Sequence, residues 1–181
     1  YVLFSRMHPA KGVNEIIEAC KLLDVTGYAD EYIVDFYGAF DTDYEEQFNG
    51  MIKGHGNINY KGFLNMLNKS GYDTLSTYDV MLFPTYWDGE GFAGVVLDAN
   101  MSGLPIIASD WNMNKEVVQD GKTGFIIPVH DYKALSNRMK AFINGDVDLL
   151  SMKQNCLEYV KQFDYRKVVT RELLQNLGLL S

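Results

Sequence analysis

Short apolar runs alternate along the chain with longer segments of helical periodicity, and this alternation constrains the fold more than any other feature. The apolar runs are rich in β-branched and aromatic residues, which is typical of buried parallel strands covered by helices on both faces. The pattern therefore predicts an α/β fold built on a doubly wound, six-stranded parallel sheet. Strands are expected at residues 1–5, 32–38, 57–61, 79–83, 105–108 and 124–127.

Helices are expected between these strands and after the last one. The first carries apolar residues at the spacing of a helix packed on a core: Val13, Ile16, Ile17, Cys20 and Leu23. This first helix is expected at residues 12–24. The others are expected at residues 43–54, 64–70, 93–102, 112–119 and 131–144. Residues 148–181 are expected to form two helices with Phe163-Asp164 as the break between them and Asp164 as the N-cap of the second. Residues 1–181 contain no repeat and no linker, which favours one domain.

Composition and charge narrow the possible partners. The 181 residues, 47% of them hydrophobic, suffice for one core, and the net charge of −8 disfavours a nucleic acid or an anionic membrane as the main partner. Cys20 and Cys156 lie in apolar helical patterns without metal-ligand spacing, which favours buried free thiols and a cytoplasmic setting. No apolar run approaches the ~20 residues of a membrane helix. The chain enters a strand at Tyr1 without a methionine, which favours a piece of a longer protein.

The loop after the first strand carries two cations where ligands of parallel sheets collect, at the carboxyl ends of the strands. Arg6 and Lys11 lie five residues apart between strand and helix. Two interpretations are open. In the first, the pair binds a diphosphate, with Arg6 supplying forked donors and Lys11 a mobile charge. In the second, both are solvated loop cations. His8, beside Pro9, is expected to be a surface histidine rather than a base.

The loop after the fourth strand, residues 84–94, is rich in glycine and leads into a helix expected to begin near Val95. Glycine allows the backbone to approach a ligand closely, and a helix N-terminus presents its amides to an anion. The amides expected to do so belong to Phe92, Ala93 and Gly94. The loop therefore predicts a phosphate site.

Two carboxylates flank the start of this helix. Glu90 precedes it and Asp98 follows eight residues later, about two helical turns along. They are placed to accept hydrogen bonds from hydroxyls at two ends of an elongated ligand, such as a sugar and a ribose. Alternatively, Glu90 caps the N-terminus of the helix and Asp98 is an ordinary solvated helix position. The apolar neighbours of Asp98 disfavour a solvated position for its carboxylate.

The same segment matches a rival motif. Gly89 to Gly94 fits the dinucleotide fingerprint G-x-G-x-x-G, and Asp110 follows about 20 residues later, where such sites carry an acidic residue. In a dinucleotide site, however, the first glycine follows its strand directly, whereas Pro84 to Asp88 intervene here. A nicotinamide- or flavin-dependent oxidoreductase is therefore the disfavoured alternative.

Taken together, these motifs resemble the C-terminal domain of the family-4 retaining glycosyltransferases of the GT-B fold. Ser5-Arg6-x4-Lys11-Gly12 resembles the family's G-R-x4-K-G loop, and Glu90-Gly-Phe-x5-Asp98 resembles its E-x7-E signature. Further matching segments follow in the family's order: Tyr37-Gly38, Tyr60-Lys61-Gly62, Asp79 to Pro84, Gly103-x-Pro105, Glu116 and Asp120-Gly-x-x-Gly124. The chain departs from the pattern at Ser5, which replaces glycine, and at Asp98, which replaces glutamate as in one branch of the family.

The resemblance implies that the donor is a UDP, GDP or ADP sugar. It implies neither a cofactor nor a metal, since cationic side chains and a helix N-terminus stabilise the leaving diphosphate. It implies retaining transfer of a hexose to a glycan or lipid-linked acceptor. The catalytic residues would be Arg6 and Lys11 at the diphosphate and Glu90 at the sugar hydroxyls. The further donor-binding residues would be Ser5, Lys61, Gly62, Phe63, Gly91, Phe92, Ala93, Gly94 and, at the ribose, Asp98.

The resemblance also implies that an N-terminal domain, absent from this chain, binds the acceptor, so the chain alone is expected to be inactive. Its final helix, about residues 165–177, would reach toward that domain and expose apolar surface. The expected setting is polysaccharide biosynthesis in the cytoplasm, at the inner face of the membrane, with membrane contact only through the absent half. A GT-B-like sugar-nucleotide epimerase and a non-catalytic nucleotide-sugar-binding module are the alternatives.

Overall fold

The computed structural model describes residues 1–41 and 43–179, and it confirms the predicted sheet of six parallel strands. The strands are β1 (Val2–Phe4), β2 (Val34–Tyr37), β3 (Ile58–Tyr60), β4 (Met81–Phe83), β5 (Ile106–Ser109) and β6 (Gly124–Ile127). Their order across the sheet is β3-β2-β1-β4-β5-β6. The order reverses between the paired strands β1 and β4, and ligands of such sheets bind outside the carboxyl ends at that point.

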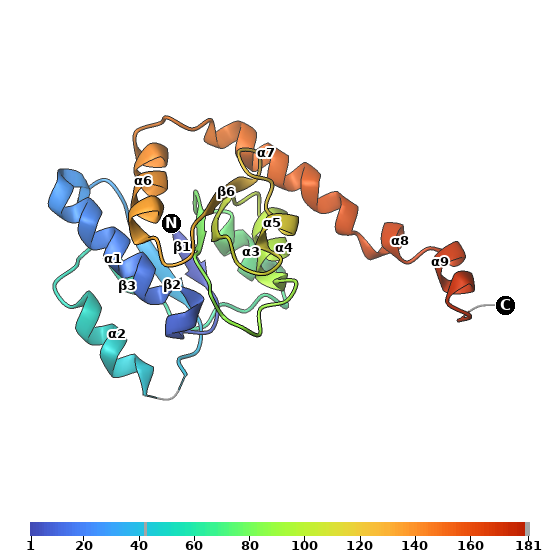
Figure 1. Ribbon diagram of the computed structural model, residues 1–181, viewed down its shortest axis with the longest axis horizontal. Coiled ribbons are helices and arrows are strands. Elements are labelled where there is room, and N and C mark those ends of the chain that lie inside the picture. Colours follow the sequence, from blue (N-terminus) through green and yellow to red (C-terminus); the bar gives the residue numbers. More distant parts are fainter. Residues whose placement is uncertain (42, 180–181) are drawn as a thin grey trace.

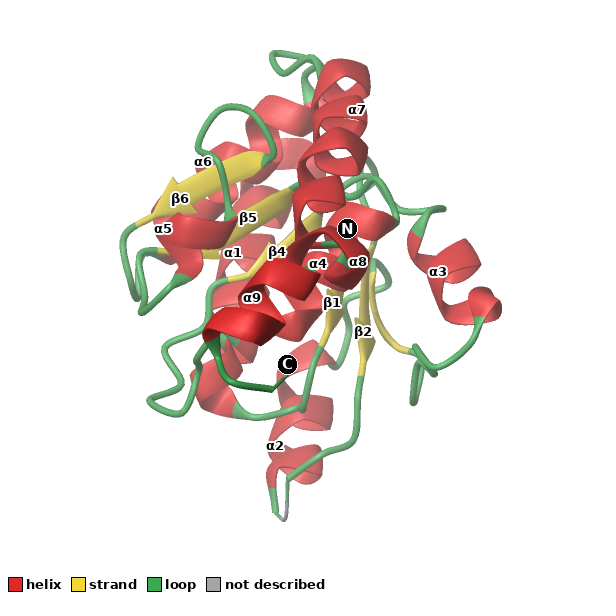
Figure 2. Cartoon of the chain, turned by 90° about the vertical axis from the view of Figure 1, so that its right-hand side faces the viewer, coloured by secondary structure: helices red, strands yellow, loops and turns green. Residues whose placement is uncertain are grey.

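Helices cover both faces of the sheet (Figures 1 and 2). One face meets α1 (Val13–Leu23), α2 (Tyr44–Ile52) and α6 (Tyr132–Ile143). The other meets α3 (Lys69–Leu75), α4 (Gly94–Met101) and α5 (Asn114–Val117), and α7 (Leu149–Tyr159) packs beside α4. Short 3₁₀ turns at Pro9–Lys11 and Val160–Phe163 and a π turn at Asp24–Tyr28 complete these elements.

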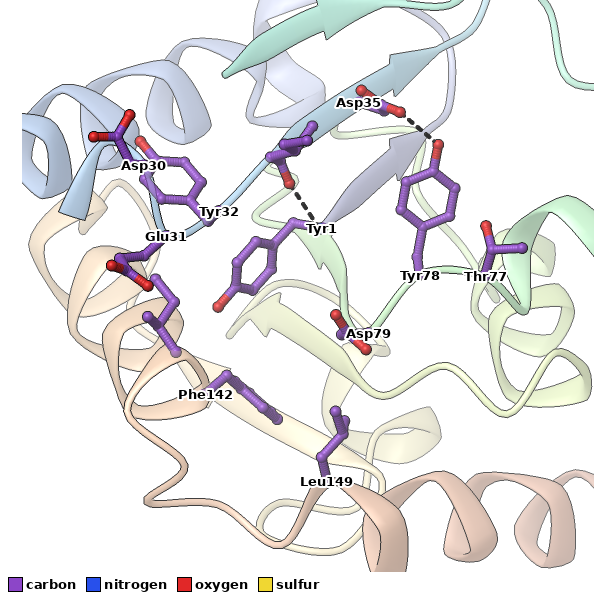
Figure 3. Close-up of a pocket in the computed structure, with 12 residues that line it drawn as sticks. Tyr1, Asp30, Glu31, Tyr32, Asp35, Thr77, Tyr78, Asp79, Phe142 and Leu149 are labelled. Atoms are coloured by element: carbon purple, nitrogen blue, oxygen red, sulfur yellow. Dashed lines mark hydrogen bonds between the residues drawn. The ribbon is translucent and has the colours of Figure 1, made fainter. Parts of the chain in front are cut away.

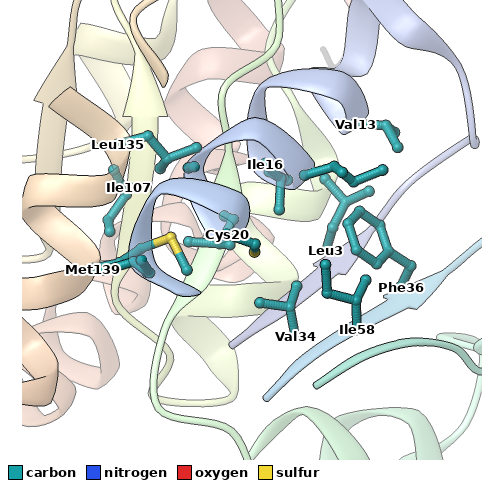
Figure 4. Packing of buried hydrophobic residues seen from close by; sticks show 14 of the residues in the cluster. Leu3, Val13, Ile16, Cys20, Val34, Phe36, Ile58, Ile107, Leu135 and Met139 are labelled. Atoms are coloured by element: carbon teal, nitrogen blue, oxygen red, sulfur yellow. The ribbon is translucent and has the colours of Figure 1, made fainter. Parts of the chain in front are cut away.

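The larger hydrophobic core lies between the sheet and α1, as predicted from the helical spacing of its apolar residues (Figure 4). Ile16 and Cys20 of α1 are fully buried with Leu3 and Val34 of the strands. Complete burial of an aliphatic side chain contributes about 1.5–3 kcal/mol. Both cysteines are buried and free in the described part of the chain, and burial raises the pKa of each thiol to about 12.

Two helices differ from their predicted positions. The helix expected at 64–70 begins only at Lys69, because the side chain of Asn65 accepts a hydrogen bond from the Leu67 amide and forms a local turn instead. The helix expected at 112–119 is the single turn α5, because Asn112 adopts a left-handed φ of 44° that a helix cannot include.

The C-terminal segment breaks at Asp164 as predicted, but its second helix is interrupted. The Asp164 carboxylate caps α8 (Tyr165–Val168), and the Thr170 hydroxyl caps a separate helix, α9 (Arg171–Asn176). The β-branched pair before Thr170 and this new cap favour two short helices over one long helix. The segment extends away from the sheet (Figure 1). Most of its apolar side chains are exposed, as expected.

Candidate functional site

The loops that follow β1 and β4 touch at the carboxyl edge of the sheet. Gly12 has a left-handed φ of 80°, and a Cβ atom on it would lie 2.4 Å from the carbonyl oxygen of Pro84. The amide of Tyr86 donates a hydrogen bond to the carbonyl of Ala10 at 2.8 Å. Glycine is therefore required where the two candidate loops meet.

This contact brings together a cation and a carboxylate that the sequence analysis had singled out in separate loops. The Nζ atom of Lys11 lies 2.5 Å from Oε2 of Glu90, and the two side chains are only 12% and 11% exposed. The hydroxyl of Thr85 donates to the same oxygen at 3.1 Å. A pair so shielded from water interacts more strongly than a surface pair, so Lys11 is not a solvated loop cation.

Trp87 is a residue of this site that the sequence analysis missed. The Nζ atom of Lys11 lies 5.4 Å from the centroid of its ring, within cation–π range. The ring of His8 meets the same indole edge to face, with centroids 4.8 Å apart. The only sequence signal was an aromatic residue inside a glycine-rich loop. Trp87 gives the Lys11–Glu90 pair an aromatic wall.

Arg6 lies at the rim of the site rather than with Lys11. Its guanidinium is 3.8 Å from the carboxylate of Asp41, and its side chain is 59% exposed. Nε2 of His8 lies 3.9 Å from the other Asp41 oxygen, while its Nδ1 accepts the Ala10 amide and caps the following 3₁₀ turn. The backbone of Ser5 continues the pairing of β1, since its amide donates to the Tyr37 carbonyl at 3.0 Å.

The N-terminus of α4 opens toward the same edge. The helix begins at Gly94 with Ala93 as its N-cap, and among the described residues no side chain, that of Glu90 included, caps it. A Cβ atom on Gly91 or Gly94 would meet no described atom within 4 Å. Gly91, Phe92 and Gly94 are exposed. The backbone at the start of α4 is thus exposed and lacks a side-chain cap among the described residues, and a helix N-terminus of this kind can bind an anion.

Asp98 lies on α4 and is held by a residue that the sequence analysis did not identify. The hydroxyl of Tyr72, on α3, donates to Oδ1 of Asp98 at 2.9 Å. Burial raises the pKa of Asp98 above its ordinary value, and the hydrogen bond from Tyr72 offsets part of this rise. Asp98 is therefore an oriented, half-buried carboxylate.

The raised pKa predicts that Asp98→Asn stabilises the chain at neutral pH. The folded chain holds the Asp98 proton more tightly than the unfolded chain, so the ionised carboxylate costs stability above the ordinary pKa of 3.8. Urea unfolding should show a higher midpoint for the variant at pH 7, with the gain vanishing as the pH falls below 3.8. Asp73→Asn, at an exposed carboxylate of α3, is the control. An equal gain at both pH values would contradict the assignment.

The loop after β3 does not present its predicted residues together. The side chain of Lys61 extends to Asp35, a buried residue of β2, and its Nζ atom lies 3.8 Å from Oδ2 of that carboxylate. The carbonyl of Gly62 accepts the Gly38 amide, and Phe63 is 76% exposed. Phe63 thus presents an exposed side chain, while the side chain of Lys61 is 43% exposed beside Asp35.

A hollow of about 680 Å³ lies at the opposite edge of the sheet, beside the amino end of β1 (Figure 3). Tyr78 and Asp79 line it together with Asp35, which accepts a hydrogen bond from the Tyr78 hydroxyl at 2.7 Å. None of the predicted site residues lines this hollow. Ligands of parallel sheets bind at the carboxyl edge, so we place the candidate site there.

Residues 1–41 and 43–179 show neither a metal-binding cluster nor a membrane-spanning helix. Within these ranges, no three His, Cys, Asp or Glu side chains gather in a way that could hold a metal ion. No helix within them combines the length and the apolar character needed to cross a membrane.

Comparison with known sequences shows one family. The family described as "Glycosyl transferases group 1" matches residues 1–163. The chain is 27% identical over 187 residues to the putative colanic acid biosynthesis glycosyltransferase WcaL of Escherichia coli, a match that covers 97% of this chain and 44% of that protein. It is 28% identical over 139 residues to the capsular polysaccharide biosynthesis glycosyltransferase CapM of Staphylococcus aureus, covering 75% and 34%. The chain thus spans less than half the length of these relatives.

Solved structures of similar fold include Anabaena Alr3699/HepE in complex with UDP, with a TM-score of 0.80 and 20% identity over 99% of this chain and 48% of that one. The C-terminal domain of the group 1 glycosyl transferase LpcC from Francisella tularensis has a TM-score of 0.75 and 20% identity, covering 89% and 83%. These likenesses concern the fold of the chain.

Proposed function

Because the chain belongs to the glycosyl transferases group 1 family, we propose that it is the donor-binding domain of a retaining, metal-independent glycosyltransferase of family 4. The observation that carries the proposal is the shielded Lys11–Glu90 pair beside the uncapped N-terminus of α4. It places a cation, a carboxylate and helix amides within one small volume. A nucleoside-diphosphate sugar offers the matching groups, a diphosphate next to sugar hydroxyls.

In the proposed complex, Lys11 and the first amides of α4 bind the diphosphate, and Arg6 swings in from the rim. Glu90 accepts hydrogen bonds from hydroxyls of the transferred hexose, and Asp98, oriented by Tyr72, binds the ribose hydroxyls. The bond between the anomeric carbon and the diphosphate oxygen breaks, and fixed positive groups stabilise the charge that develops on that oxygen. The acceptor hydroxyl attacks from the face on which the diphosphate leaves and passes its proton to the leaving diphosphate, which gives retention.

We assign the acceptor site to sequence beyond this chain, in an N-terminal domain that faces these loops. The chain spans less than half of its relatives, which supports this division and predicts that residues 1–181 alone transfer no sugar. Relatives named for colanic acid and capsular polysaccharide biosynthesis support a glycan acceptor, and we extend the proposal to lipid-linked acceptors and to a setting in the cytoplasm. HepE was solved with UDP and with UDP-glucose, which makes UDP sugars the first donors to test.

Calorimetry with UDP, GDP, ADP and their glucose or mannose derivatives tests the proposal. We expect one nucleotide class to bind, and Arg6→Ala to weaken that binding severalfold, because charge-assisted hydrogen bonds to phosphate are lost. Arg171→Ala, in the C-terminal segment, should leave the affinity unchanged. Absence of binding, or equal binding by both variants, would count against the donor site. Turnover of the donor by the full-length protein without an acceptor would instead indicate an epimerase.

A further inference from the structure

Three hydrogen bonds join the loop that carries Glu90 to the end of β5 and the segment that follows it. The three donors, which we call the β5 clamp, are Ser109, Trp111 and Asn112. Their acceptors are the backbone carbonyls of Thr85, Trp87 and Glu90, in the same order along the chain. The indole N–H of Trp111 donates at 2.9 Å and the Asn112 side-chain amide at 2.8 Å.

These bonds set the position of the Glu90 loop through its backbone. The Trp87 carbonyl accepts both the Trp111 indole N–H and the Glu90 amide, the latter at 2.9 Å, so the turn and the clamp share one atom. The Thr85 hydroxyl then donates to the Glu90 carboxylate. A shift of the loop would therefore move this carboxylate relative to Lys11.

The clamp is itself held in place. Asn112 adopts a left-handed φ of 44°, a conformation that costs energy for a residue other than glycine but that asparagine tolerates. Ser109 and Asn114 are almost fully buried, and the Asn114 side-chain amide donates to the Ser109 carbonyl at 3.0 Å. Such conformations persist where the surrounding structure determines them, and they occur often at functional sites.

We propose that Trp111 and Asn112 are positioning residues for Glu90, and that through it they set how strongly the site prefers a sugar nucleotide over the bare nucleoside diphosphate. The inference rests on the proposed function, in which Glu90 binds the sugar while Lys11 and helix amides bind the diphosphate. Misplacement of a binding group by about 1 Å can cost about 100-fold in rate. Loosening the clamp should therefore reduce sugar recognition more than diphosphate binding.

The test uses Trp111→Phe and Asn112→Asp, singly and combined. Trp111→Phe keeps an aromatic ring but removes the N–H donor. Asn112→Asp keeps the shape and the tolerance for positive φ, but places a carboxylate against the Glu90 carbonyl. Asn144→Asp makes the same change at an exposed residue after α6 and is the matched control.

Calorimetry then compares UDP-glucose with UDP, and the GDP-mannose and ADP-glucose pairs likewise. For the pair that binds, the ratio of the two affinities should fall about tenfold in the double variant, with the affinity for the bare diphosphate within about twofold of wild type. The control should retain the wild-type ratio. A double variant with the wild-type ratio overturns the positioning role.

Hydrogen exchange without ligand tests the clamp independently. Amides of residues 85–94 should exchange severalfold faster in the double variant, while β4 and β5 keep their wild-type rates. Unchanged exchange in 85–94 overturns the clamp whatever the ligand. If wild type binds none of the nucleotides, the proposed function fails, and hydrogen exchange decides the clamp on its own.

Discussion

Lys11→Ala should weaken binding of the nucleoside diphosphate by about 10- to 100-fold. Hydrogen bonds to charged groups contribute about 1.5–3 kcal/mol, and each factor of ten in affinity corresponds to about 1.4 kcal/mol. The side chain of Lys11 is 12% exposed, so water screens its charge little. Calorimetry with UDP, GDP and ADP measures the loss.

The same substitution should also destabilise the empty chain. It leaves the carboxylate of Glu90, which is 11% exposed, with the Thr85 hydroxyl as its remaining partner among those described. Removing one partner of a buried ion pair costs about 3–5 kcal/mol, and the cost here should approach that range because little of the remaining carboxylate is exposed. Adding Glu90→Gln removes that charge, so the double variant should regain thermal stability without regaining affinity. This difference separates loss of binding from loss of folding.

Lys21→Ala is the matched control. Lys21 lies on α1 close to Lys11 in sequence and pairs with Glu18 at 2.8 Å, but both side chains are well exposed. Exposed pairs contribute about 0–1 kcal/mol, so this variant should match wild type in affinity and nearly in stability. If Lys21→Ala weakened nucleotide binding as much as Lys11→Ala does, net charge rather than the shielded pair would account for the effect.

Gly38→Ala should lower the free energy of unfolding by more than about 3 kcal/mol. Gly38 follows β2 with a φ of 147°, and a Cβ atom there would lie 1.7 Å from the carbonyl oxygen of Ser5. That oxygen belongs to the backbone just after β1, so relief requires separating β1 from its neighbour β2 near the candidate site. Urea unfolding followed by circular dichroism measures the change.

Gly50→Ala makes the same substitution elsewhere and should have the opposite effect on the free energy of unfolding. Gly50 lies within α2, and a Cβ atom on it would meet no described atom within 4 Å. Alanine in a helix interior is more stable than glycine by about 0.5–1 kcal/mol, so the unfolding midpoint should rise. If Gly38→Ala unfolded at the same urea concentration as wild type, the two strands would move apart without loss of stability and the prediction would be wrong.

The positions of the strands and the two candidate loops follow from local sequence. A run such as Val80 to Phe83 is apolar over strand length, and α1 repeats its apolar residues every three or four positions, so each element is encoded within its own segment. The same holds for the Arg6 to Gly12 loop and the glycine-rich loop with Glu90, whose residue types indicate anion binding without reference to distant parts of the chain.

Tertiary contacts chose the partners of these residues. Lys11 meets Glu90 across 79 positions of sequence, whereas Arg6 faces Asp41 and Lys61 is drawn over the sheet to Asp35. Spacing along a chain restricts neighbours only within one element, while an ion pair depends on which elements the sheet order places side by side. The candidate loops were therefore predictable from the sequence, and the shielded pair, its Trp87 wall and the β5 clamp became visible only once β1, β4 and β5 lay together.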